Sequence, residues 1–144
     1  MSSVAGPVPP TPFRHATALW VLLFACESVN GALREAFLTP VVGPVVARQV
    51  GLATGTVLVL AIATLFHAWL GARTRRAQLQ VGALWGVLTL AAEIALAWKL
   101  GLSPGAFLAG YDATRGGVMA FGLLVLLLAP MVGAWVGDRR SRLA

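Results

Sequence analysis

Four apolar runs, at about residues 16–38, 50–71, 81–100 and 116–137, limit what this chain can fold into. Each run has about the 20 residues that an α-helix, rising about 1.5 Å per residue, needs to cross a hydrocarbon layer of about 30 Å. Lipid offers the backbone no hydrogen bonds, so such runs must be helices, and four strands are too few to close a barrel. The sequence therefore predicts an all-α integral membrane protein, a four-helix bundle.

The composition favours the same class of protein. Hydrophobic residues make up 58% of the chain and charged residues 11%, and the mean hydropathy is +0.83. Soluble domains carry about 25% charged residues, so this chain is too poor in charge to be one. The proline-rich start lacks the basic residues and the cleavage pattern of a signal peptide. We therefore expect a mobile N-terminal tail at residues 1–15 and a basic tail at residues 140–144.

Cations are distributed unevenly between the two ends of the predicted helices. One end carries seven of the 11 Lys and Arg residues with a single acid, Asp138, whereas the opposite half, from mid-helix outwards, carries four cations and four acids. Short cytoplasmic loops are enriched in Lys and Arg, so we expect both termini in the cytoplasm. The seven cations adjoin helix ends and would attract anionic lipid headgroups of the bilayer. This accounts for the pI of about 11.4 without a nucleic-acid partner.

The chain repeats itself at a spacing of 66 residues. This shift aligns Glu27 with Glu93, "ARQVG" with "ATRGG" and "AWLGAR" with "AWVGDR". Matches of Trp, Glu and Arg are uncommon between unrelated apolar helices, so we interpret residues 18–73 and 83–139 as copies of one helical hairpin. Each copy has two spans, so both copies would enter the membrane in the same direction. The predicted bundle is therefore built from two tandem parallel repeats.

Each copy places one carboxylate, Glu27 or Glu93, near the middle of an apolar helix. A carboxylate at that depth is costly, so it should face protein or water, and it should have a partner or be protonated. Asn30 and Arg34 follow Glu27 on one helix face, and Thr89 precedes Glu93 by one turn. We interpret Glu27, Glu93, Asn30 and Thr89 as a polar core that binds a proton or cation, or that only joins helices through hydrogen bonds.

Charged residues at the predicted outer surface form a second candidate group. Its cations would bind an anion or a headgroup, gate access to the glutamates, or only extend to the lipid surface; they are Arg34, Arg48, Lys99 and Arg115. Asp112 is placed to cap the fourth helix. The two outer connections, "LTPVVGPVVARQ" and "LSPGAFLAGYDATR", are apolar, so we expect them to lie in the interface or to fold back over the bundle.

Other side chains have plainer expected roles. Aromatic residues near the cytoplasmic surface fit an interfacial belt; they are Trp69, Trp85 and Trp135. Small residues that would allow close helix packing are Gly51, Gly55, Gly117 and Gly122. His15 and His67 are weak candidates for a metal or haem pair, because isolated interfacial histidines seldom have that role. With no phosphate-binding glycine loop, Cys/His metal spacing or nucleophile–base motif, we expect no cofactor, and the sequence favours a non-enzymatic function while leaving an enzyme open.

The order of "NGALRE", "LTP", "ARQ", "ALW" and "YD" with "RGG" resembles that of a family of uncharacterised small four-helix bacterial membrane proteins. The resemblance covers most of the chain outside the N-terminal tail. It implies the fold and a location in the bacterial inner (plasma) membrane, and it implies no activity. The topology and Glu27 alone are similar to small multidrug-resistance transporters. The charge bias, Glu93 and the outer arginines depart from that pattern.

Three functions remain open from the sequence. The chain is a small transporter or permeation protein, oligomeric, in which Glu27 and Glu93 carry a proton or cation. Alternatively, it is a non-catalytic accessory or assembly subunit whose polar residues dock a larger membrane protein or lipid. In the third reading it is a lipid-associated enzyme that uses Glu and Arg near an interface for acid–base chemistry and phosphate binding.

Overall fold

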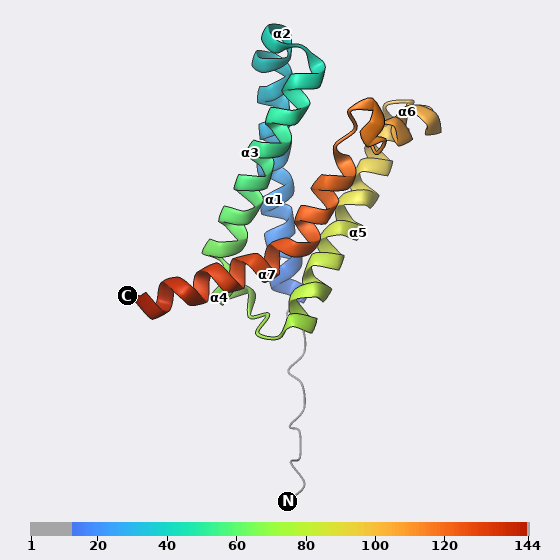
Figure 1. The fold of residues 1–144 in the computed structure, drawn as a ribbon. Coiled ribbons are helices and arrows are strands. Elements are labelled where there is room, and N and C mark those ends of the chain that lie inside the picture. The colour runs from blue at the N-terminus through green and yellow to red at the C-terminus, as the bar shows by residue number, and fades with distance from the viewer. Residues whose placement is uncertain (1–12, 144) are drawn as a thin grey trace, which may run out of the picture.

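The computed structural model describes residues 13–143, which are mostly helical and contain no strand. Four long helical segments run through the molecule (Figure 1): α1 (Phe13–Leu33) continued by the π-helix η1 (Arg34–Leu38) and α2 (Thr39–Val42), α3 (Pro44–Leu65) followed by α4 (His67–Leu70), α5 (Arg75–Lys99), and α7 (Met119–Leu143). Between α5 and α7 lie α6 (Pro104–Ala109) and the 3₁₀-helix η2 (Ala113–Arg115). Four helices are long and apolar enough to cross a membrane, which indicates a multi-pass membrane protein.

The long helices form a ring in which α1 and α7 are each flanked by α3 and α5. The start of α1, the end of α7 and α4 lie at one end of the bundle, here called the terminal end (Figure 1). The short elements α2 and α6 lie at the opposite end, the connection end. In this view α1 and α3 incline away from α5 and α7 towards the connection end.

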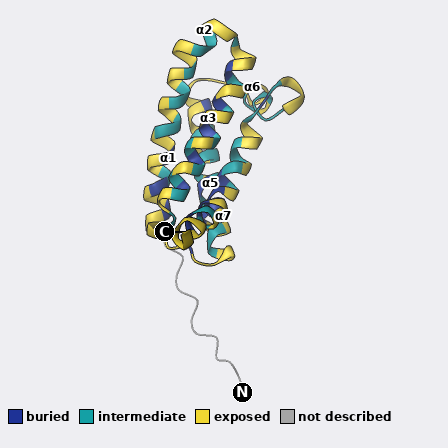
Figure 2. Ribbon diagram, turned by 60° about the vertical axis from the view of Figure 1, so that its left-hand side comes forward, coloured by how far each residue is buried: buried dark blue, intermediate teal, exposed yellow. Residues whose placement is uncertain are grey.

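Ala47 and Ala97 are buried nearer the connection end, but the largest buried apolar cluster lies in the terminal half of the bundle (Figure 2). It is formed by the first halves of α1 and α5, the second half of α3, the middle of α7 and the α4 region; its members are Ala16, Leu19, Leu23, Val59, Ala63, Leu70, Ala72, Val81, Trp85, Leu126 and Ala129. Large apolar side chains on the outside are exposed, as surfaces that face lipid should be; Val57 and Val87 are 68% and 65% exposed. On the first span, polar residues replace apolar ones on the inner face towards the connection end.

Close helix contacts depend on glycines, several of which the sequence did not single out. A Cβ atom on Gly82 of α5 would overlap the backbone carbonyl of Leu127 in α7. A Cβ atom on Gly133 of α7 would lie 2.6 Å from the backbone oxygen of Ala63 in α3. These helices therefore meet backbone to backbone. The predicted packing role fails for Gly122, because a Cβ atom there would face open space with no other atom within 4 Å.

The two connections differ from the expected pair of apolar loops. The first contains almost no loop, because α2 ends at Val42 and α3 begins at Pro44. Gly43 alone reverses the chain with a φ of 82°, a conformation that glycine adopts without strain, and Pro44 is preorganised for the first helical turn. The second connection is a longer folded segment with two short helices. The tandem repeat therefore stays a prediction.

Helix ends also extend beyond the predicted spans. The helix α1 begins at Phe13, so the last three residues of the expected N-terminal tail are helical, and residues 1–12 lie outside the described part of the chain. At the other end α7 continues to Leu143, through residues expected in the basic tail. Cations in the last turn of a helix are stabilised by its dipole, and Arg140 and Arg142 lie there.

Candidate functional site

A polar stripe on α1 and the first residue of η1 lies against α3 in the connection half of the bundle. It consists of Glu27, Asn30 and Arg34, all partly buried. It extends the helix face that supplies the core residues Ala16, Leu19 and Leu23, because residues three or four positions apart share a face. One face of α1 is therefore apolar near the terminal end and polar near the connection end.

Two glycines of α3 make room for the ends of the stripe. A Cβ atom on Gly55 would lie 2.8 Å from Oε2 of Glu27, and one on Gly51 would lie 2.8 Å from Nη1 of Arg34. These distances are shorter than ordinary van der Waals contact, so a larger residue would have to displace the charged groups. These two glycines therefore allow close packing by leaving space for the side chains of Glu27 and Arg34.

Hydrogen bonds satisfy the stripe only in part. The Asn30 amide donates to Oε2 of Glu27 at 3.4 Å, and the Thr54 hydroxyl of α3 donates to Oδ1 of Asn30 at 3.2 Å. Two buried atoms, Oε1 of Glu27 and Nε of Arg34, have no hydrogen-bond partner among residues 13–143. Among residues 13–143 the ion pairs involve neither of these side chains. The stripe therefore contains one buried acceptor, on Glu27, and one buried donor, on Arg34, whose hydrogen bonds the described residues do not satisfy.

The π-helical turn η1 contains both the last residue of the stripe, Arg34, and an exposed acid. It begins at Arg34, and π-turns within α-helices are frequent at functional sites. Glu35, the next residue, is exposed and accepts a hydrogen bond from the Thr39 hydroxyl at 3.2 Å. The same helix therefore presents one carboxylate in the seam and another outside it.

The second predicted carboxylate, Glu93, lies on α5 and is partly buried. The Tyr111 hydroxyl, from the segment between α6 and η2, donates to Oε2 of Glu93 at 2.5 Å. Burial and this hydrogen bond to Glu93 raise the pKa of Tyr111 above its ordinary value, so the phenol stays a neutral donor. Thr89 instead accepts a hydrogen bond from Trp20 of α1 at 3.0 Å. The second connection therefore folds back onto the carboxylate.

The two glutamates lie at similar depth. Two hydrogen bonds between α1 and α5 each join residues 69 positions apart, Trp20 to Thr89 and Trp85 to Ala16. Both helices start at the terminal end and run in the same direction, so this register places Glu93 about three residues, or about 4.5 Å, nearer the terminal end than Glu27. Their hydrogen-bond partners nevertheless come from different elements.

The other charged residues at the connection end do not join the stripe. The Asp112 side chain accepts a hydrogen bond from the Thr114 backbone at 3.0 Å and pairs with Arg115 at 3.3 Å. It caps η2, not the fourth long helix as predicted, because α7 starts only at Met119. Arg48 donates to the Pro44 carbonyl, and Lys99 is exposed at the last residue of α5. Of the four predicted cations, Arg34 alone contacts α3 beside Glu27.

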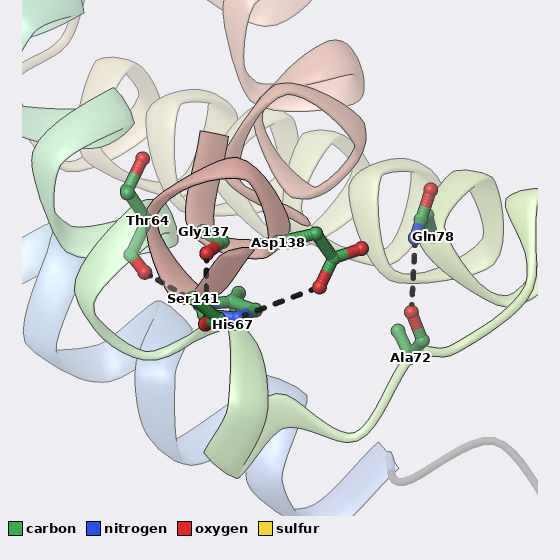
Figure 3. A network of polar contacts seen from close by, with 7 residues as sticks. All are labelled: Thr64, His67, Ala72, Gln78, Gly137, Asp138 and Ser141. Carbon is green, nitrogen blue, oxygen red and sulfur yellow. Dashed lines mark hydrogen bonds and ion pairs between the residues drawn. The ribbon is translucent and has the colours of Figure 1, made fainter. Parts of the chain in front are cut away.

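The two histidines have separate surroundings at the terminal end. The exposed ring of His15 stacks on Trp69 with centroids 4.4 Å apart. The ring of His67 lies 2.8 Å from the Thr64 carbonyl and 3.9 Å from the Asp138 carboxylate (Figure 3). Within residues 13–143, no three His, Cys, Asp or Glu side chains are grouped so that they could hold a metal ion.

The predicted aromatic belt needs one correction. Trp69 and Trp135 are 47% and 57% exposed, but Trp85 is 0% exposed and its Nε1 donates to the Ala16 carbonyl at 2.8 Å. The helix α5 starts at Arg75, six residues before the predicted start, so Trp85 lies three turns inside the helix and in the core. It joins α1 to α5.

No protein-family model, curated protein or solved structure matches this chain. The family resemblance drawn from the sequence therefore stays a prediction. What the chain does must be inferred from the geometry of its own residues.

Proposed function

We propose that this protein is a small membrane transporter or permeation protein in which Glu27 and Glu93 bind a proton or a monovalent cation during its passage. The observation that carries this proposal is Oε1 of Glu27, an acceptor that is buried in a glycine-lined seam without a hydrogen-bond partner. An unpaired acceptor at membrane depth costs free energy, and a bound proton or cation would remove that cost.

The surroundings of Glu27 support a transient occupant. Its only hydrogen-bond donor among residues 13–143, Asn30, lies at 3.4 Å, near the limit of a hydrogen bond. Arg34 lies two turns nearer the connection end with its Nε unpaired. In the proposed protein it gates the seam, because a guanidinium there repels a cation and can alternate between Glu27 and the lipid surface.

Glu93 supplies a second acceptor at nearly the same depth. Its Oε2 is held by Tyr111 from a segment that folds over the connection end. Release of this hydrogen bond would free the carboxylate and move the segment in one event. The proposal therefore assigns Glu93 and Tyr111 to the connection-end step, and Glu27 to binding within the seam.

Replacing Glu27 with glutamine is expected to abolish ion flux, because an amide cannot bind and release a proton or balance a cation. The measurement is H⁺ and Na⁺ uptake into proteoliposomes under a K⁺ diffusion potential, read with pH-sensitive and Na⁺-sensitive dyes. Glu35→Gln is the matched control: the same change on the same span, at an exposed carboxylate. Equal flux in wild type and protein-free liposomes, or equal loss in both variants, would contradict the proposal.

An accessory or assembly subunit is the alternative, favoured by the partial exposure of all three stripe residues in the single chain. A second membrane protein, or another copy of this chain, could cover the stripe and complete its hydrogen bonds. Absence of flux together with a larger assembly in native membranes, lost in Glu27→Gln, would favour this alternative.

The proposal places the protein in the inner membrane of a bacterial cell. The cations at the terminal end set its orientation, with that end in the cytoplasm. Reporter domains fused after residues 74 and 144 are expected to report a cytoplasmic location, and one fused after residue 107 an external location. The measurement is paired alkaline phosphatase and fluorescent-protein activity. The opposite pattern would refute the orientation.

A further inference from the structure

A cavity of about 300 Å³ lies at the terminal end of the bundle, whereas the polar stripe lies in the connection half. Polar side chains from four segments line it: His67 of α4, Arg73 of the following loop, Gln78 of α5 and Asp138 of α7. Figure 3 shows three of these side chains around the end of α7. None of the four takes part in the proposed ion pathway.

The walls of this cavity are held in place by hydrogen bonds. The Nδ1 atom of His67 lies 2.8 Å from the Thr64 carbonyl and must donate to it, which turns Nε2 towards Asp138 at 3.9 Å. The Gln78 amide nitrogen donates to the Ala72 carbonyl at 3.0 Å. The Asp138 carboxylate and the Gln78 carbonyl oxygen then remain as acceptors, so the cavity suits a ligand that donates hydrogen bonds.

An apolar groove continues from the cavity along α7. This second space, of about 440 Å³, shares Arg73, Gln78 and Asp138 with the first. Its apolar lining comes from Met131, Val132 and Trp135 of α7, and Arg75 also lines it. Trp135 is 57% exposed on the outside of a membrane-length helix, where lipid chains would run. A polar pocket that opens into such a groove suits an amphiphile, with a polar headgroup in the pocket and an apolar chain in the groove.

The charges specify the polar part of that amphiphile. Arg73 lines both the cavity and the groove, Arg75 lines the groove, and the Arg139 guanidinium carbon lies 3.9 Å from the centroid of the Trp135 ring. Guanidinium groups recognise phosphate oxygens in pairs. Asp138, which also lines both spaces, offers a carboxylate. The site therefore combines an apolar wall, two guanidinium groups and a carboxylate, which complement an acyl chain, a phosphate and an ammonium group.

We propose that this site binds a phospholipid whose phosphate carries a primary ammonium group, with an acyl chain along α7, the phosphate between Arg73 and Arg75, and the ammonium group at Asp138. A choline headgroup carries three methyl groups on its nitrogen and therefore offers no N–H donors to the acceptors of the cavity. A glycerol headgroup would leave Asp138 without a counter-charge. The site is independent of ion flux through the seam.

The test is thermal unfolding of the detergent-solubilised chain with added dioleoyl phosphatidylethanolamine, phosphatidylcholine, phosphatidylglycerol or chain-free glycerophosphoethanolamine. A ligand of the folded state raises Tm with its concentration. We expect the ethanolamine lipid to raise Tm at the lowest concentration, and the chain-free headgroup to have no effect at that concentration. Arg73→Gln and Arg75→Gln should each raise the lipid concentration for a half-maximal shift about tenfold, the loss of one charge-assisted contact.

Matched variants distinguish a specific lipid-binding site from nonspecific attraction between lipids and surface cations. Arg76→Gln removes a neighbouring exposed cation that lines neither space, and it should leave the lipid response unchanged. Asp138→Asn should reduce the difference between the ethanolamine and choline lipids, because the counter-charge for the ammonium group is lost, while the phosphate contacts remain. Equal shifts for all three wild-type lipids, a full shift with the chain-free headgroup, or an equal loss in Arg76→Gln would each overturn the proposal.

Discussion

Replacing Trp85 with alanine is expected to lower the free energy of unfolding by about 3–5 kcal/mol, the usual cost of truncating a fully buried tryptophan. The Trp85 side chain is 0% exposed in the apolar core, and its Nε1 donates to the Ala16 carbonyl at 2.8 Å. Its loss would open a cavity at the contact between α1 and α5. Chemical or thermal unfolding of the protein in detergent measures the effect.

Trp98→Ala is the matched control for this variant. Trp98 lies on the same helix and is 86% exposed, so its truncation should change stability by no more than about 0.5 kcal/mol. Equal losses of stability in the two variants would contradict the position of Trp85 in the core.

The four helices could be predicted from the sequence because each is an apolar run of membrane length with no competing strand pattern. Their ends could not, because helix ends depend on caps and contacts beyond hydropathy. Thr74 caps α5 through its hydroxyl and starts that helix before the apolar run, among arginines. That early start moved Trp85 from the expected interface into the core.

The polar stripe was predictable on α1, because the spacing of Glu27, Asn30 and Arg34 fixes their common face. Its partner helix was not, since an i, i+3, i+7 pattern says nothing about which neighbour it meets. Gly51 and Gly55, four residues apart on α3, are a recognisable small-residue signal, but packing partners become evident only in three dimensions.

Tyr111 was missed as the partner of Glu93. The signal was present: a tyrosine in an apolar connection needs a hydrogen-bond partner for its hydroxyl when it is partly buried. Eighteen residues separate the two, and only the fold of the segment between α5 and α7 brings them together. The terminal-end cavity was missed for the same reason, because its side chains come from four separate segments.

Gly82→Ala is expected to disrupt the packing of α5 against α7. The added Cβ would overlap the Leu127 carbonyl, and a backbone atom, unlike the end of a flexible side chain, cannot rotate away. The two helices would have to separate along their contact, at a cost of about 1–3 kcal/mol or more. The expected result is a clear fall in Tm in detergent and a lower yield of folded protein.

Gly86→Ala is the matched control, because it makes the same change in helix propensity without a contact to α7. Gly86 lies one turn farther along α5, and a Cβ atom there would meet no atom within 4 Å. Alanine favours a helix over glycine by about 1 kcal/mol at either position, so Gly86→Ala should be neutral or stabilising. The two variants carry the same chemical change on the same helix, and opposite signs can arise only from the contact with α7. Stabilisation by both would mean that α5 and α7 do not meet at Gly82.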